Sequence, residues 1–176
     1  MWQLIIDTLR HEFSDLSDPA QWVRLVVRLG LAVLLGALIG YEREQRESAA
    51  GLRTHMLVAL GTALFVLVPQ QAGLSDADLS RVIQGVVAGV GFLGAGAVIK
   101  QTQSGQVHGL TTAAGIWSTA AIGVAVGLGR ELTAIVSAVT VVVILGLLLR
   151  IEKRMGGDKG MIALDPVRDR EPPRGS

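Results

Sequence analysis

The sequence predicts an all-α integral membrane protein with about five transmembrane helices that pack closely through glycine. Half of the 176 residues are hydrophobic and only 18% are charged, and the mean hydropathy of +0.49 exceeds that of an ordinary soluble domain. The chain has 22 glycines, which let membrane helices approach one another closely. It has no cysteine, which excludes disulfides, thiolate metal sites and cysteine nucleophiles.

An amphipathic helix is expected ahead of the membrane domain, within residues 1–17. Asp7, Arg10 and Glu12 interrupt any apolar core there, and no small-residue cleavage site follows, so the segment does not have the pattern of a signal peptide. We expect the helix to lie on the outer leaflet, or else to pack against the bundle or a partner protein. Its apolar residues recur at helical spacing: Trp2, Ile5, Ile6, Leu9, Phe13 and Leu16.

Residues 18–150 form the predicted transmembrane domain. The first helix has a clear start, because Asp18 can cap it and Pro19 suits its first turn. The second apolar run is the shortest and is expected to stop at Pro69. Ser75 and Asp78 form a capping-box pattern ahead of the third helix. The expected helices cover residues 19–41, 52–68, 76–99, 110–128 and 131–150, and the last two are near bilayer length.

The distribution of basic residues predicts the orientation in the membrane. With five crossings, the first loop, the third loop and the carboxy-terminal tail share one side and hold 11 of the 16 Lys and Arg residues. The positive-inside rule places that side in the cytoplasm and the amino terminus outside. The alternative is four crossings, in which the second apolar run is re-entrant and returns to the same side of the membrane. Residues 151–176 contain prolines, glycines and scattered charges, and are expected to form a flexible cytoplasmic tail.

The candidate functional site is a set of polar residues at the cytoplasmic helix ends. The apolar runs on either side of the charged segment 41–55 are short, so helices of bilayer length must carry ionisable groups toward the hydrocarbon. Such groups are costly and usually functional. If the helices form a bundle, these groups converge in one vestibule that faces the cytoplasm. Its candidate members are Glu42, Arg43, Arg53, Thr54, His55, Lys100, His108, Thr111 and Thr112.

The charged members also have a purely structural interpretation. Glu42 with Arg46, and Arg43 with Glu47, have the i, i+4 spacing of an exposed helix extension. This interpretation is favoured for Glu44, Arg46 and Glu47. A buried Glu–Arg pair could also lock the first two helices together without binding anything.

No metal site, cofactor or enzyme activity is predicted. His55 and His108 are expected to be hydrogen-bonding groups between helices, because no spacing in the chain resembles a structural zinc site. Thr111 lies three residues after His108, but no further residue is placed to orient them as a nucleophile and base.

Glycines at regular spacing form a second pattern. Close helix packing or dimerisation is the favoured interpretation. The alternative is a partly unwound third helix that exposes its carbonyl groups to an ion. The segment 89–94 matches a nucleotide-binding fingerprint by letter only, because it lies inside an apolar run of membrane length. The expected packing residues are Gly36, Gly40, Gly85, Gly89, Gly91, Gly94, Gly96, Gly123 and Gly127.

Three blocks of sequence, taken in order, resemble the membrane domain of the MgtC/SapB family. They are Gly-Ala-Leu-Ile-Gly-Tyr-Glu-Arg-Glu at 36–44 with Ala-Gly-Leu-Arg-Thr-His at 50–55, then Gly-Val-Gly-Phe-Leu-Gly-Ala-Gly at 89–96, then Gly-Leu-Thr-Thr-Ala-Ala-Gly-Ile-Trp at 109–117. The resemblance implies a bacterial inner-membrane protein associated with growth in low magnesium and, in some pathogens, with survival inside host cells. Members have been named magnesium-transport proteins, and regulation of other membrane proteins, including ATP synthase, is also attributed to them.

The resemblance also marks candidate residues. It carries over Glu42, Arg43, Arg53, Thr54, His55, Thr111, Thr112 and Trp117 as matches to family motifs, without an assigned chemical step, and so adds Trp117 to the candidate members of the vestibule. Longer members have a soluble carboxy-terminal domain, whereas this chain looks like a short form that ends in a Pro/Gly/Arg tail.

The expected function is regulation or scaffolding of other membrane proteins, linked to magnesium homeostasis and adaptation to low magnesium. The alternative is an ion channel or carrier in which Glu42 and backbone carbonyls handle a cation. Arg43, Arg53 and Lys100 would repel a divalent ion, and a basic vestibule suits an anion, a phosphate or an acidic lipid headgroup better. The expected partners are the lipid bilayer, a second copy in a homodimer, and other membrane proteins, with no nucleic acid.

Overall fold

The computed structural model describes residues 1–12, 18–99 and 109–155. Those residues form six helices and no strand, which confirms the predicted all-α class. Four helices, α2 to α5, are long and apolar enough to cross a membrane. The described apolar part of the last helix, Glu131–Leu147, is shorter, so a fifth crossing stays a prediction. The helices are α1 (Trp2–Glu12), α2 (Pro19–Glu44), α3 (Leu52–Gln71), α4 (Asp76–Ile99), α5 (Leu110–Gly127) and α6 (Glu131–Met155).

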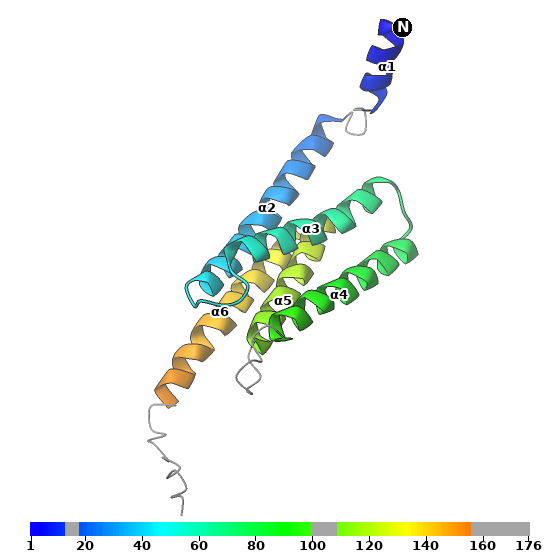
Figure 1. Cartoon of the computed structure of the whole chain (residues 1–176). Helices are drawn as coiled ribbons and strands as arrows, with labels where there is room; N and C mark the ends of the chain where they lie inside the picture. Colours follow the sequence, from blue (N-terminus) through cyan, green and yellow to red (C-terminus); the bar gives the residue numbers. More distant parts are fainter. Residues whose placement is uncertain (13–17, 100–108, 156–176) are drawn as a thin grey trace, which may run out of the picture.

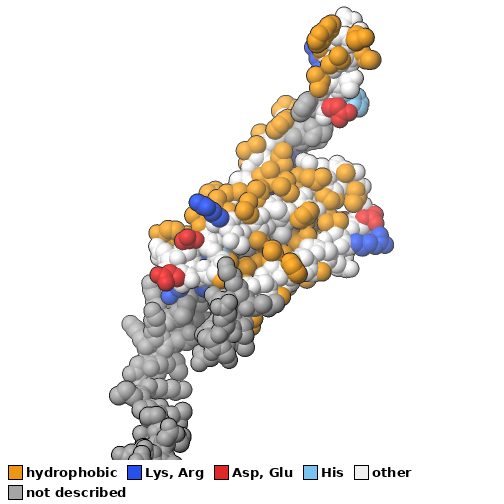
Figure 2. Space-filling model, in the orientation of Figure 1, with side chains coloured by type: hydrophobic (Ala, Val, Ile, Leu, Met, Phe, Trp, Pro, Cys, Tyr) orange, Lys and Arg blue, Asp and Glu red, His pale blue; other side chains and the backbone are white. Residues whose placement is uncertain are grey.

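The chain runs back and forth through one bundle made of α2 to α6, and α1 extends beyond it with no buried residue (Figure 1). Helix α5 is central, because it packs against α2, α3, α4 and α6. In its most apolar stretch 56% of the residues are buried, against 11% in α4. The face of the bundle seen in Figure 2 is largely apolar, and the charged side chains on it gather toward the ends of the bundle. That distribution suits helices that cross a bilayer.

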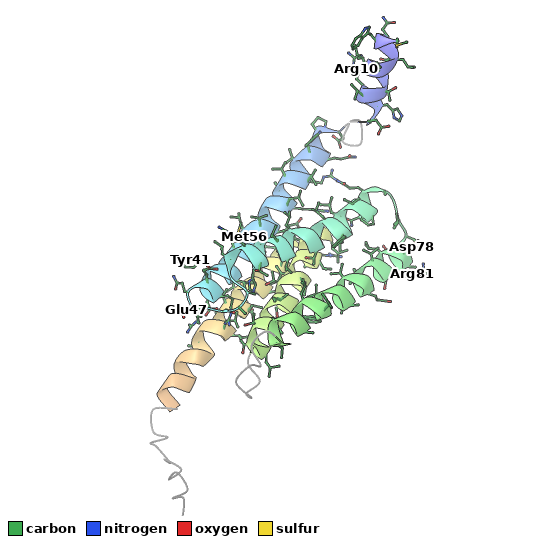
Figure 3. The ribbon with its side chains drawn as sticks, viewed as in Figure 1. Arg10, Tyr41, Glu47, Met56, Asp78 and Arg81 are labelled. Atoms are coloured by element: carbon green, nitrogen blue, oxygen red, sulfur yellow. The ribbon has the colours of Figure 1, made fainter. Side chains whose placement is uncertain are left out.

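The two ends of the bundle carry different polar clusters. We call one end the Arg43 end, because Arg43 is in the last turn of α2, which lies beside the first turns of α3 and α5. We name the Arg28 end after an arginine of α2 that reaches the ends of α3 and α5 and the start of α6. Glu47 lies at the Arg43 end, and Asp78 lies at the opposite end (Figure 3).

Capping residues fix the starts of two helices as the sequence predicts. The side chain of Asp18 accepts a hydrogen bond from the amide of Ala20 at 3.0 Å, and proline occupies the first turn of α2. At the start of α4, the amide of Asp78 donates to Ser75 Oγ at 3.3 Å.

Other helix ends differ from the expected ones. Helix α2 continues to Glu44, beyond 41, because polar residues extend it past its apolar part. Helix α3 runs through Pro69 to Gln71 instead of stopping at 68. The helix continues after the proline, because the amide of Ala72 reaches the carbonyl of Val68 at 3.0 Å. Helix α5 ends at 127, one residue early, and α6 continues past 150 to 155.

Glycines bring α3 against both α2 and α5. A Cβ atom on Gly36 would lie 2.6 Å from the carbonyl oxygen of His55, and one on Gly40 would lie 2.7 Å from the Cα of Leu52. Helix α5 makes the same kind of approach, because a Cβ on Gly127 would lie 2.7 Å from the carbonyl oxygen of Ala63. Only glycine fits such distances, so these backbones are in direct contact.

The glycines of α4 are arranged differently. Gly94 approaches Ala113 of α5, where an added Cβ would meet ordinary contact at 3.4 Å. Gly85, Gly89, Gly91 and Gly96 have no atom of another helix within 4 Å of such a Cβ. These four glycines therefore do not pack closely against another described helix of the same chain. Close packing against a helix of a second molecule stays a prediction. The whole of α4 is helical, which contradicts the alternative of an unwound ion-binding segment.

Candidate functional site

A buried guanidinium forms the centre of the polar cluster at the Arg43 end. Arg43 is 6% exposed, and its Nη1 lies 3.5 Å from Glu42 Oε2. Its Nη2 lies 3.4 Å from Ser48 Oγ, which in turn lies 2.9 Å from Thr112 Oγ1 at the start of α5. The cluster therefore connects the end of α2, the turn after it and the first turn of α5. A buried arginine of this kind needs several polar neighbours to offset the loss of water.

Glu42 also binds Arg46, as the i, i+4 spacing predicts. The second predicted pair, Arg43 with Glu47, is not formed. Helix α2 has ended before Glu47, which lies in the turn with a φ of +52°, and Arg43 points inward instead. Glu42 thus forms ion pairs with two arginines, one buried and one near the surface.

Glu44 caps the next helix, a role that its exposed position in the sequence pattern did not indicate. Its Oε2 accepts a hydrogen bond from the amide of Leu52 at 2.8 Å. The N-cap residue of α3, Gly51, has no side chain that could do this, and a Cβ there would collide with the Glu44 carboxylate. A carboxylate at a helix amino terminus also complements the helix dipole. The turn between α2 and α3 is therefore closed by this contact.

Replacing Glu44 by alanine should lower the free energy of unfolding by about 1 kcal/mol, as expected for loss of a helix cap. Glu47→Ala is the matched control, because it removes a nearby carboxylate for which the described residues show no side-chain bond. Denaturant titration in detergent, followed by circular dichroism, measures both variants. Equal effects of the two changes would contradict a capping role for Glu44.

His55 is fully buried between α2, α3 and α5. Its Nδ1 lies 2.9 Å from the carbonyl oxygen of Gly51 in the preceding turn. Its Nε2 faces α5, where a Cβ on Gly115 would lie 3.5 Å away, and has no hydrogen-bond partner in the described part of the chain. The residue therefore occupies the interface between helices, but its one side-chain hydrogen bond among the described residues is to the start of its own helix, so a hydrogen bond between helices stays a prediction.

The other predicted members do not share a cavity with this cluster. Arg53 and Thr54 line a groove between α3 and α4, and Thr111 lines a cavity formed by α5 and α6. Trp117 is 52% exposed and lines a cavity between α4 and α5. Lys100 and His108 lie outside the described residues. The structure thus brings together Glu42, Arg43, His55 and Thr112 at the Arg43 end, and places the remaining described members on separate surfaces.

Among the residues that the structure describes, no three His, Asp or Glu side chains are grouped as metal ligands would be. Two carboxylates at the Arg43 end, those of Glu42 and Glu44, instead contact cations and a helix amino terminus respectively. The arrangement can hold helices in register and can present buried polar atoms to a small molecule or water.

A second polar cluster surrounds Arg28, which the sequence interpretation missed. Its Nη1 donates to Gln70 Oε1 and to the carbonyl oxygen of Gly127, both at 3.2 Å, and its Nε lies 3.5 Å from Glu131 Oε1. One side chain therefore connects α2 to the end of α3, the end of α5 and the start of α6. The positive charge also complements the carbonyl end of α5. The available signal was the position of Arg28 within a largely apolar span, one turn after Arg24.

Comparison with known proteins gives consistent matches. The model of the MgtC family matches residues 29–154. Protein SrpB of Synechococcus elongatus is 51% identical over 119 residues, which are 61% of this chain and 65% of SrpB. Escherichia coli K12 has a "putative magnesium transporter YhiD" that is 42% identical over 128 residues, 68% of this chain and 58% of YhiD. Protein MgtC of Salmonella typhimurium is 42% identical over 125 residues, 71% of this chain and 52% of MgtC.

The matched region thus spans between about half and two thirds of the length of these relatives. No solved structure matches the chain.

Proposed function

The chain belongs to the MgtC family, and on that basis we propose that it is a non-enzymatic regulator or scaffold of other bacterial inner-membrane proteins in magnesium homeostasis. Magnesium is named for one of its relatives, YhiD. The regulatory role is our interpretation of how the polar groups and the open helix faces are used. In the proposed orientation the amino terminus lies outside and the Arg43 end faces the cytoplasm.

The observation that carries the proposal is the exposed small-residue face of α4. Ala88, Gly91 and Ala95 are all exposed and recur at i, i+3 and i+7, so they lie on one side of the helix. A Cβ on Gly91 would meet no atom within 4 Å. Small residues on a lipid-facing helix allow the backbone of another helix to approach closely. This face is therefore suited to bind a helix of a partner membrane protein.

The polar groups support the same proposal. Arg28 and Arg43 both contact groups on the chain's own helices, and Glu42 is held between two arginines. Contacts of this kind connect helices within one molecule. A scaffold protein needs such contacts to hold its helices in fixed positions.

A carrier is the second candidate, and a specific observation favours it. Glu42 Oε2, Arg43 Nη1 and Nε, and His55 Nε2 are buried and have no hydrogen-bond partner within the described ranges. Glu42 Oε2 and Arg43 Nη1 are an ion pair at 3.5 Å, a distance that leaves both able to bind another group. Buried polar atoms without partners are unusual and are often functional. A small ion or several waters would fit this description.

Gly91→Leu should reduce the recovery of a copurifying membrane protein by about tenfold, which corresponds to about 1.4 kcal/mol, because the leucine side chain prevents the close approach of a partner helix. Gly30→Leu is the matched control, since Gly30 also faces open space but lies on α2. Affinity purification from crosslinked bacterial membranes, with quantitative mass spectrometry, measures the recovery.

A measurement of ion flux tests the carrier, which is the second candidate. The purified protein in vesicles that contain a magnesium-sensitive dye should give no more flux than an unrelated helical membrane protein. Flux above that level, together with unchanged partner recovery for Gly91→Leu, would favour the carrier and contradict the scaffold.

A further inference from the structure

A groove of about 760 Å³ runs between α3 and α4. Three glycines widen it, because Gly61, Gly85 and Gly89 each leave open space where a Cβ would be. Its other walls are mainly aliphatic and aromatic side chains, among them Phe65 and Leu93. Both helices are candidate membrane spans, so the groove faces the hydrocarbon of the bilayer. The face over α3 and α4 is accordingly rich in apolar side chains (Figure 2).

The groove has one polar end. Arg53 and Thr54, in the first turn of α3, line it at the Arg43 end, whereas Phe65 and Val82 line the opposite end. Arg53 is exposed, and in the described part of the chain neither it nor Thr54 has an ion pair or a side-chain hydrogen bond. A single unpaired cation thus lies at one end of a largely apolar groove, in the first turn of a candidate membrane span.

We propose that this groove binds an anionic phospholipid, with an acyl chain between α3 and α4 and the phosphate on Arg53. The acyl chain would fill the apolar length without leaving any polar group unpaired. The guanidinium can bind two phosphate oxygens at once, and basic pockets between membrane helices recognise acidic headgroups. The Thr54 hydroxyl offers a further donor beside the same headgroup.

Charge argues against a second copy of the chain as the occupant. A twofold axis along the membrane normal would bring two α3–α4 grooves together with both Arg53 side chains at the same end. Among the residues that the structure describes, the groove lining contains no carboxylate that could pair with the Arg53 of another copy. An anionic lipid supplies the missing negative charge directly.

The lipid site is independent of the proposed partner surface. Gly85 and Gly89 face the groove, whereas Gly91 lies two residues further along α4 and therefore on nearly the opposite side of the helix. Loss of one function can be distinguished from loss of the other by separate substitutions on the same helix.

Native mass spectrometry of the full chain in detergent tests the proposal with added phosphatidylglycerol or phosphatidylcholine. The wild-type protein should retain one phosphatidylglycerol with about fivefold preference, the effect of one basic residue near a headgroup. Arg53→Gln should remove the preference. Gly89→Leu and Gly85→Leu should each remove retention of both lipids, because the leucine side chain occupies the groove.

Two controls keep the test specific. Arg130→Gln removes an exposed cation at the Arg28 end, and Gly91→Leu adds the same side chain outside the groove; both should bind lipid as the wild type does. Circular dichroism verifies that each variant is folded. Unchanged phosphatidylglycerol retention in both groove variants would overturn the proposal. So would a wild-type dimer that Gly89→Leu dissociates without any change in retained lipid, since the groove would then hold a second copy.

Discussion

Gly123→Ala should lower the free energy of unfolding by about 3 kcal/mol, the upper part of the range for overpacking a well-packed interior. A Cβ at this position of α5 would collide with the Thr62 hydroxyl and with the backbone carbonyl of Ala59, both on α3. The hydroxyl can rotate, but the carbonyl moves only if α3 moves. Because α3 also contacts α2 through Gly36 and Gly40, a shift of α3 would disturb two interfaces together.

Gly61→Ala is the matched control, because Gly61 lies within α3 and a Cβ there meets no atom within 4 Å. Both substitutions gain the same helix propensity, roughly 1 kcal/mol, so the difference between them isolates packing. Gly61→Ala should leave stability unchanged or raise it by up to about 1 kcal/mol. Denaturant titration in detergent, followed by tryptophan fluorescence, measures both. Similar values for the two variants would show that α5 and α3 are not in the close contact described.

The glycine pattern shows what the sequence could predict about packing. Spacing of four residues marks Gly36 with Gly40, Gly85 with Gly89, and Gly123 with Gly127 alike. The first and third pairs contact another helix of the same chain, whereas the second lines an open groove. Spacing predicts that a helix can be approached closely. Which neighbour does so depends on the arrangement of all five bundle helices, which the local sequence does not contain.

Helix starts were predictable because capping is local. Asp18 and Ser75 act on amides within three residues of themselves, so sequence alone locates them. Glu44 caps Leu52 across an intervening turn, and Arg28 contacts Gln70 from another helix. These contacts depend on how the chain folds back, and no spacing rule identifies them.

The candidate site was predictable in composition but not in arrangement. The short apolar runs indicated that ionisable groups lie close to the helix packing, and Arg43 is buried at the end of α2. The arrangement of the site depends on the direction in which each side chain points from its helix. His55 turns toward α5, whereas Arg53, two residues earlier, turns toward the groove beside α4. Residues two apart on a helix face different neighbours, so two residues at the same end of the bundle need not line the same cavity.

Glu42→Gln should lower the free energy of unfolding by about 3 kcal/mol, because it leaves a buried charge without its counterion. The Arg43 guanidinium would keep only the Ser48 hydroxyl, at 3.4 Å, as a side-chain partner among the described residues. Asp78→Asn is the control, since it breaks an i, i+3 ion pair with Arg81 that is largely exposed at the opposite end (Figure 3). Breaking such a surface pair should cost less than about 1 kcal/mol. Denaturant titration of the two variants in the same detergent measures the difference.

A double variant separates the ion pair from other roles of Glu42. Arg43→Met should cost less in the Glu42→Gln background than in the wild type, because the charge that it removes is then already unpaired. If Glu42→Gln has no larger effect than Asp78→Asn, the Arg43 charge is balanced by something other than Glu42. A bound anion or ordered water at the Arg43 end would then be required. That result would favour the carrier, since a scaffold needs the pair for stability whereas a carrier needs the same atoms to be available.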